Sequence, residues 1–219
     1  MENSNLKPFY LKDCSLAVVA TGESAYSLAQ FREILTRIAL SSIYYHFWGE
    51  RMRPSFVHLE YHNDFARWVH TALHDNVLSE RLGIIDPTEF DDLEEVRKLI
   101  IELIDERLNE IEFALWARRE LKFHFLRSII IVFDMKIGLQ HPSELKAVLP
   151  KLPASSIYLH FIDARGRNVQ RIDDFSVWLM EYGNEYADLI KKIEYIDPYF
   201  LTLTEIKQKL IEVVNECLP

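Results

Sequence analysis

The sequence predicts an α/β fold of the helix-rich α+β kind, internally duplicated about a pseudo-two-fold axis, with one strand and about four helices in each copy. Two observations predict it. Short apolar runs rich in β-branched residues are typical of strands, and they alternate with segments whose apolar residues recur at helical spacing. The chain also repeats itself in order and register. With 219 residues, 49% of them apolar, the chain has the size and composition of a globular protein.

The duplication is clearest at residues 41–47, SSIYYHF, which recur as SSIYLHF at residues 155–161 with six of the seven positions identical. The offset there is 114, and it falls to 110 further on, where the second copy lacks four residues. Beyond that loss, residues 64–69 match residues 174–179. Because order and register hold through both halves, we predict two copies of one structural unit.

The predicted copies span residues 9–108 and 123–218, and residues 109–122 are expected to form a helical connection. The segment Asn109–Glu120 carries apolar residues at helical spacing, so the last helix of the first copy is expected to begin near Leu93 and run through Ala117. Each copy has too few predicted strands to be expected to fold alone. We therefore expect the two copies to pack as one compact unit.

Each copy is expected to begin with a buried strand, at Ser15–Thr21 and Phe123–Phe133. A strand whose backbone amides and carbonyls are unpaired at its edges is prone to aggregation. The two strands are therefore expected to pair with each other or with a partner chain, with helices covering the sheet. A helix follows each strand. The predicted core face is Leu28, Phe31, Leu35 and Ile38 in the helix of the first copy, and Leu145, Val148, Leu149 and Leu152 in the helix of the second. We expect Ser143 to cap the second helix and prolines to end it.

Two further helices are predicted in each copy. Ser41 and Ser155 are expected to be N-caps of the helix through the repeated SSIY segment. Asp64 and Asp174 are expected to be N-caps of the next helix, where Phe65, Trp68 and Leu73 belong to a core-facing stripe. We predict that Trp68 and Trp178 are core residues rather than a platform for a ligand.

Charge and cysteine content restrict the environment and the partners. The net charge of −9 disfavours binding to nucleic acid, because an acidic surface repels phosphates. No apolar run approaches the length of a membrane span, and no signal segment is recognised at the start. The two cysteines are expected to be reduced. We expect a cytoplasmic protein, a homodimer, with no membrane or nucleic-acid partner and no cofactor.

The common catalytic motifs are absent from the sequence, among them the P-loop, the GxGxxG and GxSxG loops and HExxH. Five of the eight histidines fall between residues 46 and 74. If residues 56–62 are extended, His58, Glu60 and His62 share one face and are suited to bind a divalent metal. A metal-dependent hydrolase is therefore the alternative function. The other interpretation is that these are ordinary surface and loop histidines.

A second candidate site is the polar set that recurs in both copies. It comprises Ser42, Tyr44, His46, Arg51 and Arg53 in the first copy, and Ser156, Tyr158, His160, Arg165 and Arg167 in the second. A repeated core must be kept, but surface polar residues need not be, so this set predicts a ligand site in which arginine holds an anion. The alternative is structural: serine caps a helix, tyrosine and histidine bind buried backbone groups, and arginine pairs with glutamate between the copies.

At these segments the chain resembles an uncharacterised prokaryotic family, domain of unknown function 5752. Its members share the serine-serine-isoleucine-tyrosine-histidine segment, here Ser41–His46, and an asparagine-aspartate-phenylalanine-x-x-tryptophan segment, here Asn63–Trp68. The resemblance covers essentially the whole chain. The second copy departs from it at Leu159 and Asp173, which argues against assuming equal roles for the two copies.

The resemblance brings no established activity. It implies an accessory role near carbohydrate-active enzymes in bacteria and archaea. The sequence therefore favours a non-catalytic ligand-binding, regulatory or accessory protein, with a small anionic or sugar-related ligand. A purely structural partner of a carbohydrate enzyme is a further hypothesis.

Overall fold

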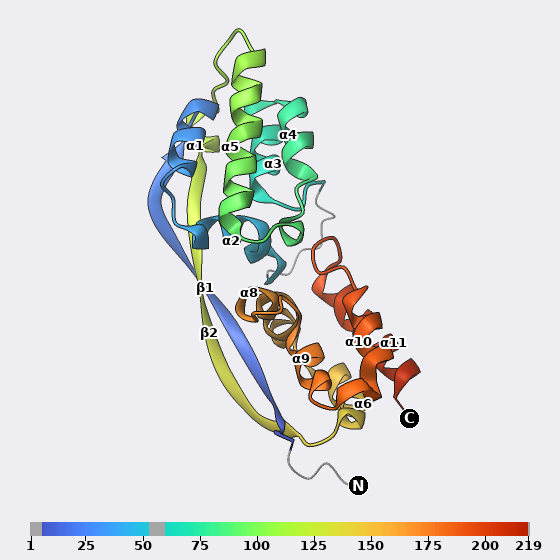
Figure 1. Ribbon diagram of the computed structural model, residues 1–219. Coiled ribbons are helices and arrows are strands. Elements are labelled where there is room, and N and C mark those ends of the chain that lie inside the picture. The colour runs from blue at the N-terminus through green and yellow to red at the C-terminus, as the bar shows by residue number, and fades with distance from the viewer. Residues whose placement is uncertain (1–5, 53–59, 219) are drawn as a thin grey trace. The chain divides into compact units, whose positions relative to one another are not determined.

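The computed structural model describes residues 6–52 and 60–218 of the chain. It is a helix-rich α+β fold, as predicted, with one two-stranded antiparallel sheet among the described residues. The strands are β1 (Phe9–Ala25) and β2 (Phe123–Leu139), which lie side by side (Figure 1). Two arrangements were expected, pairing of the strands with each other or with a partner chain, and the structure shows the first.

The chain divides into two compact units. One is Leu16–Ile129, and the other combines Met1–Ser15 with Ile130–Pro219. We call them the α1–α5 unit and the α6–α11 unit after their helices. The units do not coincide with the two sequence copies, because each strand contributes one part to each unit.

The α1–α5 unit contains five α-helices in its described part (Figure 1). They are α1 (Leu28–Leu35), α2 (Leu40–Trp48), α3 (Asp64–Trp68), α4 (Asn76–Gly83) and α5 (Leu93–Glu110). Helix α3 continues as a π-helical turn over Val69–Leu73. The predicted stripe is buried, with Phe65 and Val69 fully shielded from solvent.

The α6–α11 unit contains six α-helices in its described part. Its helices are α6 (Leu145–Val148), α7 (Ala154–Ile157), α8 (Ala164–Arg167), α9 (Asp174–Met180), α10 (Ala187–Glu194) and α11 (Leu203–Cys217). Helices α7 and α8 are joined by a π-helical turn over Tyr158–Asp163. The predicted core residues Leu145, Leu149 and Leu152 are buried, whereas Val148 is only half-buried.

The expected helix through Ala117 was wrong. Helix α5 ends at Glu110, and Ile111 adopts an extended conformation. The following segment instead pairs with the chain ahead of α1: Trp116 forms an isolated bridge with Ser27, and the Ala117 amide donates to Tyr26 O at 2.7 Å. Pairing of the backbone with a segment far away in the sequence thus determines the conformation here, although the apolar residues have helical spacing.

The predicted helix starts need correction. Helices α2 and α7 begin at Leu40 and Ala154, ahead of Ser41 and Ser155, and neither has a side-chain cap. Asp64 and Asp174 are the first helical residues of α3 and α9, and the capping residues are Asn63 and Asp173. The turn before α6 is capped by His141, whose side chain accepts from the Ser143 amide. Ser143 itself is therefore not the cap.

The strands are longer than predicted, and the middle of β2 is not buried. Ile129, Ile131 and Phe133 are 49%, 46% and 50% exposed. Within the described residues each strand has a single neighbouring strand. The first residue of each strand, Phe9 or Phe123, makes aromatic contacts with the helices of one unit. Among the described helices, none is both long and apolar enough to pass through a membrane.

Candidate functional site

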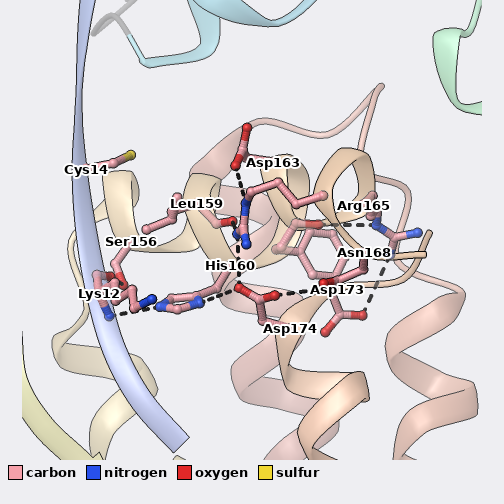
Figure 2. A network of polar contacts seen from close by, with 12 residues as sticks. Lys12, Cys14, Ser156, Leu159, His160, Asp163, Arg165, Asn168, Asp173 and Asp174 are labelled. Atoms are coloured by element: carbon pink, nitrogen blue, oxygen red, sulfur yellow. Dashed lines mark hydrogen bonds and ion pairs between the residues drawn. The ribbon is translucent and has the colours of Figure 1, made fainter. Parts of the chain in front are cut away.

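In the α6–α11 unit, two hydrogen bonds join one helix to a single strand residue. Ser156 and His160 lie one turn apart on the helix that starts at Ala154, and both side chains are buried. The Ser156 hydroxyl donates to Lys12 O at 2.8 Å, and the Lys12 amide donates to His160 Nε2 at 3.0 Å (Figure 2). The two side chains thus bind the amide and carbonyl of one residue, as a neighbouring strand would.

The second ring nitrogen of His160 is also engaged. Nδ1 lies 2.8 Å from Asp174 Oδ2. Because Nε2 accepts a hydrogen bond from an amide, the proton of the neutral ring is assigned to Nδ1, which donates to the carboxylate. Burial favours a raised pKa of Asp174, but the His160 hydrogen bond and the charge of Arg167 outweigh it and lower the pKa. His160 is therefore held from both sides in one orientation.

Two arginines follow His160 in the sequence, and one of them, Arg167, contacts Asp174. Arg167 donates to Asp163 Oδ2 at 2.6 Å, to Leu159 O at 3.0 Å and to Asp174 Oδ2 at 3.1 Å. Arg165 donates from Nε to Phe161 O at 3.2 Å, and its guanidinium lies 4.8 Å from the centre of the Phe161 ring. Burial lowers the pKa of Arg165, and the nearby carboxylates, Asp173 first among them, offset part of that effect.

Asp173 carries a buried carboxylate beside this network. Its Oδ1 accepts from the Ser176 amide at 2.9 Å and its Oδ2 from the Ser176 hydroxyl at 2.7 Å. Arg165 Nη2 lies 4.0 Å from Oδ2. Burial raises the pKa of Asp173 against these hydrogen bonds and the positive charge. The first copy has neutral Asn63 at this position, which caps α3 and also donates to Leu82 O at 2.9 Å.

The α1–α5 unit contains the same arrangement. The Ser42 hydroxyl donates to Leu126 O at 2.6 Å, and the Leu126 amide donates to His46 Nε2 at 3.0 Å. His46 Nδ1 lies 2.7 Å from Asp64 Oδ2, and Arg67 pairs with the other oxygen of that carboxylate. Lys12 and Leu126 are themselves 114 positions apart, so the strand residues match in the same register as the helices.

The tryptophans complete each arrangement. The Trp178 indole donates to Lys7 O at 3.2 Å, and the Trp68 indole donates to Leu121 O at 2.7 Å. Both side chains are buried, as predicted for core residues. We call Ser42, His46 and Trp68 the first strand clamp, and Ser156, His160 and Trp178 the second strand clamp.

The other residues of the predicted polar set are not members of the clamps. Tyr158 is fully buried, Tyr44 is half-buried, and the Arg51 guanidinium lies 5.1 Å from the centre of the Trp48 ring. Arg53 lies outside the described residues. The structural interpretation holds for the histidines in that they bind backbone groups, the amides of Lys12 and Leu126. It was wrong for the serines, which bind strand carbonyls rather than cap helices, and for Arg167, which pairs with aspartate rather than glutamate.

The metal alternative falls partly outside the described residues, because His58 does. Glu60 and His62 are exposed on either side of the buried Tyr61. Glu60 Oε2 lies 3.7 Å from His70 Nε2. In the part of the chain that the structure describes, no cluster of three or more side chains suited to a metal is found.

Sequence reasoning missed the two aspartates and the two strand residues. Asp64 and Asp174 were interpreted as helix caps, although their recurrence beside the repeated histidines could have indicated a histidine partner. Lys12 and Leu126 contribute only backbone atoms, so no residue type identifies them.

Comparisons with known proteins bear on the fold and the family. Among solved structures, the chain is similar to OrfY from Thermoproteus tenax, with 24% identity over 99% of each chain and a TM-score of 0.80. At that identity the likeness shows the fold alone. No curated protein matches the sequence. The model of a family of unknown function, DUF5752, matches residues 6–215, and the chain therefore belongs to this family.

Proposed function

We propose that this chain is a non-catalytic binding or accessory protein, and that the repeated serine, histidine and aspartate form structural clamps for its strands. One observation carries the proposal. Both ring nitrogens of His46 and of His160 are engaged by internal partners, an amide on one side and a carboxylate on the other. A histidine bound in this way has no nitrogen left for a substrate proton or a metal.

The same residue types form the triad of serine hydrolases, so the geometry has to separate the two functions. In a triad, the serine hydroxyl donates to histidine Nε2 and is activated as the nucleophile. Here the Lys12 amide donates to Nε2 of His160, and the Ser156 hydroxyl donates to the Lys12 carbonyl. Ser156 is also fully buried. The serine thus lacks the base that would activate it.

A serine-directed phosphonate probe tests this proposal. We expect no adduct on Ser42 or Ser156 of the intact chain when labelled peptides are analysed by mass spectrometry. Stoichiometric labelling of Ser156 that disappears in His160→Asn would instead establish a hydrolase, and the proposal would fail.

A second candidate function is the binding of a small anion at Arg165. The Nη2 atom of Arg165 is buried without a hydrogen-bond partner among the described residues, and Asp173 Oδ2 lies 4.0 Å away. A buried donor of this kind calls for an oxygen from water or a ligand. The implied link to carbohydrate metabolism makes a sugar phosphate the ligand class to test first.

Thermal-shift measurements with sugar phosphates, inorganic phosphate and divalent metals examine the second candidate. A shift that disappears in Arg165→Gln and persists in the control Arg127→Gln would support an anion site at Arg165. If the shift is equal in all three proteins, the anion binds elsewhere. Co-purification from the native source with a carbohydrate enzyme would separately test the accessory role.

A further inference from the structure

Each clamp holds a strand segment from the distant half of the chain. His160 and Lys12 are 148 residues apart, and His46 and Leu126 are 80 residues apart. Thus α7 and the turn that follows it hold the first part of β1, whereas α2 holds the first part of β2. Both contacts lie within their own compact unit.

The polar contacts of a clamp involve the strand backbone alone. Serine and histidine bind the carbonyl and amide of Lys12 in one unit and of Leu126 in the other. Tryptophan binds the carbonyl of Lys7 or Leu121, five residues earlier. A lysine and a leucine thus occupy equivalent places, so the clamp does not select these side chains.

One strand side chain is the same in both clamps. The Phe9 ring centre lies 5.1 Å from that of His160, 5.5 Å from Phe175 and 5.3 Å from Trp178. The corresponding distances for Phe123 are 4.7 Å to His46, 5.6 Å to Phe65 and 5.5 Å to Trp68. Each clamp therefore binds an extended segment with a phenylalanine three residues before the hydrogen-bonded position.

We infer that the two clamps are interchangeable receptors for one strand motif, and that a second copy of this chain supplies such a strand when the chain's own segment is displaced. Exchange replaces each hydrogen bond and ring contact by an equivalent one, so the contacts themselves do not oppose it. The chain's own segment is favoured by its high effective concentration. Strand-exchanged dimers are therefore expected once that advantage is removed.

Transplanting a segment in the full chain tests interchangeability. Residues 7–12, KPFYLK, are replaced by LKFHLL, the sequence of residues 121–126 with the fully buried Leu11 retained. We expect the melting temperature to change by less than about 2 °C, whereas Phe9→Asp lowers it by at least about 6 °C. A loss in the transplant equal to that in Phe9→Asp would overturn the inference.

Complementation between two full-length variants tests exchange. Phe9→Asp leaves the second clamp intact and prevents the chain's own segment from docking. The double variant Ser156→Ala, His160→Phe disables the clamp and leaves the segment intact. With different affinity tags, the mixture should yield a 1:1 complex of twice the 25.9 kDa chain mass, measured by light scattering after two-tag purification.

The matched control adds Phe9→Asp to the clamp-disabled variant, which should abolish the 1:1 complex because no intact segment remains. If the two single-defect proteins keep the helical circular dichroism of the parent and still form no mixed complex, the inference fails. If either loses that signal, the milder pair Phe9→Ala and Ser156→Ala gives the same comparison, and absence of its mixed complex counts equally against exchange.

Discussion

Lys12 donates its backbone amide to His160 Nε2 at 3.0 Å across 148 residues of sequence, and Ser156 donates to the carbonyl of the same lysine at 2.8 Å. One residue of β1 is therefore bound on its amide and its carbonyl by side chains of one helix. Unpaired strand edges invite aggregation, and this pairing protects the edge of the sheet at that residue.

Removing one clamp histidine should free only the strand it holds. We expect His160→Ala to destabilise the chain by about 2–4 kcal/mol, because the Lys12 amide and Asp174 lose their partner and a cavity forms in place of the buried ring. Hydrogen exchange should accelerate at the Lys12 amide and not at Leu126, with the reverse pattern in His46→Ala. The half-buried His70 is the control, and His70→Ala should cost less than about 0.5 kcal/mol. Equal acceleration at both amides would contradict independent clamps.

Exchanging the capping residues of the two copies should have unequal effects. Asp173→Asn should be close to neutral at pH 7, within about 1 kcal/mol, since a buried carboxylate is costly and asparagine caps the equivalent helix. Asn63→Asp should cost about 1–3 kcal/mol, because Leu82 O loses a buried donor. Urea unfolding of both variants checks the prediction, and equal losses would refute it.

Asp173 also gives a pH dependence with a defined sign. Burial raises the pKa of Asp173 in the folded chain. A raised folded pKa contributes stability that is present below the unfolded pKa and lost as the pH rises through the folded pKa. The free energy of unfolding of Asp173→Asn relative to the parent should therefore increase between pH 4 and pH 7. A constant difference over that range would contradict the assignment.

Asp174 should act in the opposite direction. Burial acts against it, but the His160 hydrogen bond and Arg167 lower the pKa of Asp174 in the folded chain. Its contribution is thus present above the unfolded pKa and lost as the pH falls through the folded pKa. Asp174→Asn should remove part of the acid sensitivity of the parent below about pH 4. Acid unfolding followed by circular dichroism measures this, and an unchanged acid transition would count against it.

Cys14 offers a direct report on the second clamp. Its thiol donates to Ser155 O at 3.3 Å, and burial is the main cause that raises its pKa to about 12. We expect Cys14 in the folded chain to react with a disulfide reagent at pH 8 far more slowly than in the denatured chain. Ser156→Ala should accelerate the reaction, whereas Ser42→Ala should leave it unchanged. Peptide mapping separates Cys14 from Cys217, and an equal response to both variants would exclude this use.

The sequence was sufficient to predict the fold class and the burial of Trp68 and Trp178. It left the pairing of the two strands with each other as one of two expected arrangements. It also singled out Ser42, His46, Ser156 and His160, because they recur. Their role could not be settled, since their partners are the backbone atoms of Lys12 and Leu126. Every residue type except proline has both an amide N–H and a carbonyl, so the sequence does not identify such partners. The aspartates show a different limit. An aspartate is favoured at a helix N-cap and in the first turn alike, so Asp64 could not be placed to within one residue.

The prediction of a helical connection between the copies was wrong for a different physical reason. Ile111, Ala114 and Leu115 fit a helical spacing, but the chain near Trp116 pairs with the backbone at Ser27. Local pattern carries no information about a partner almost ninety residues earlier. The same limit applies to the middle of β2, where a β-branched run predicted a buried strand and the side chains are half exposed.

The long separations between clamp and strand also have a consequence for biosynthesis. A chain is made from its N-terminus, so the first clamp has its helix long before Leu126 exists, and Lys12 must wait for residues 156 and 160. Neither unit can be completed by its own half of the chain. Contacts of such long range close slowly, and folding should therefore be delayed until synthesis is nearly finished and then proceed in both halves together.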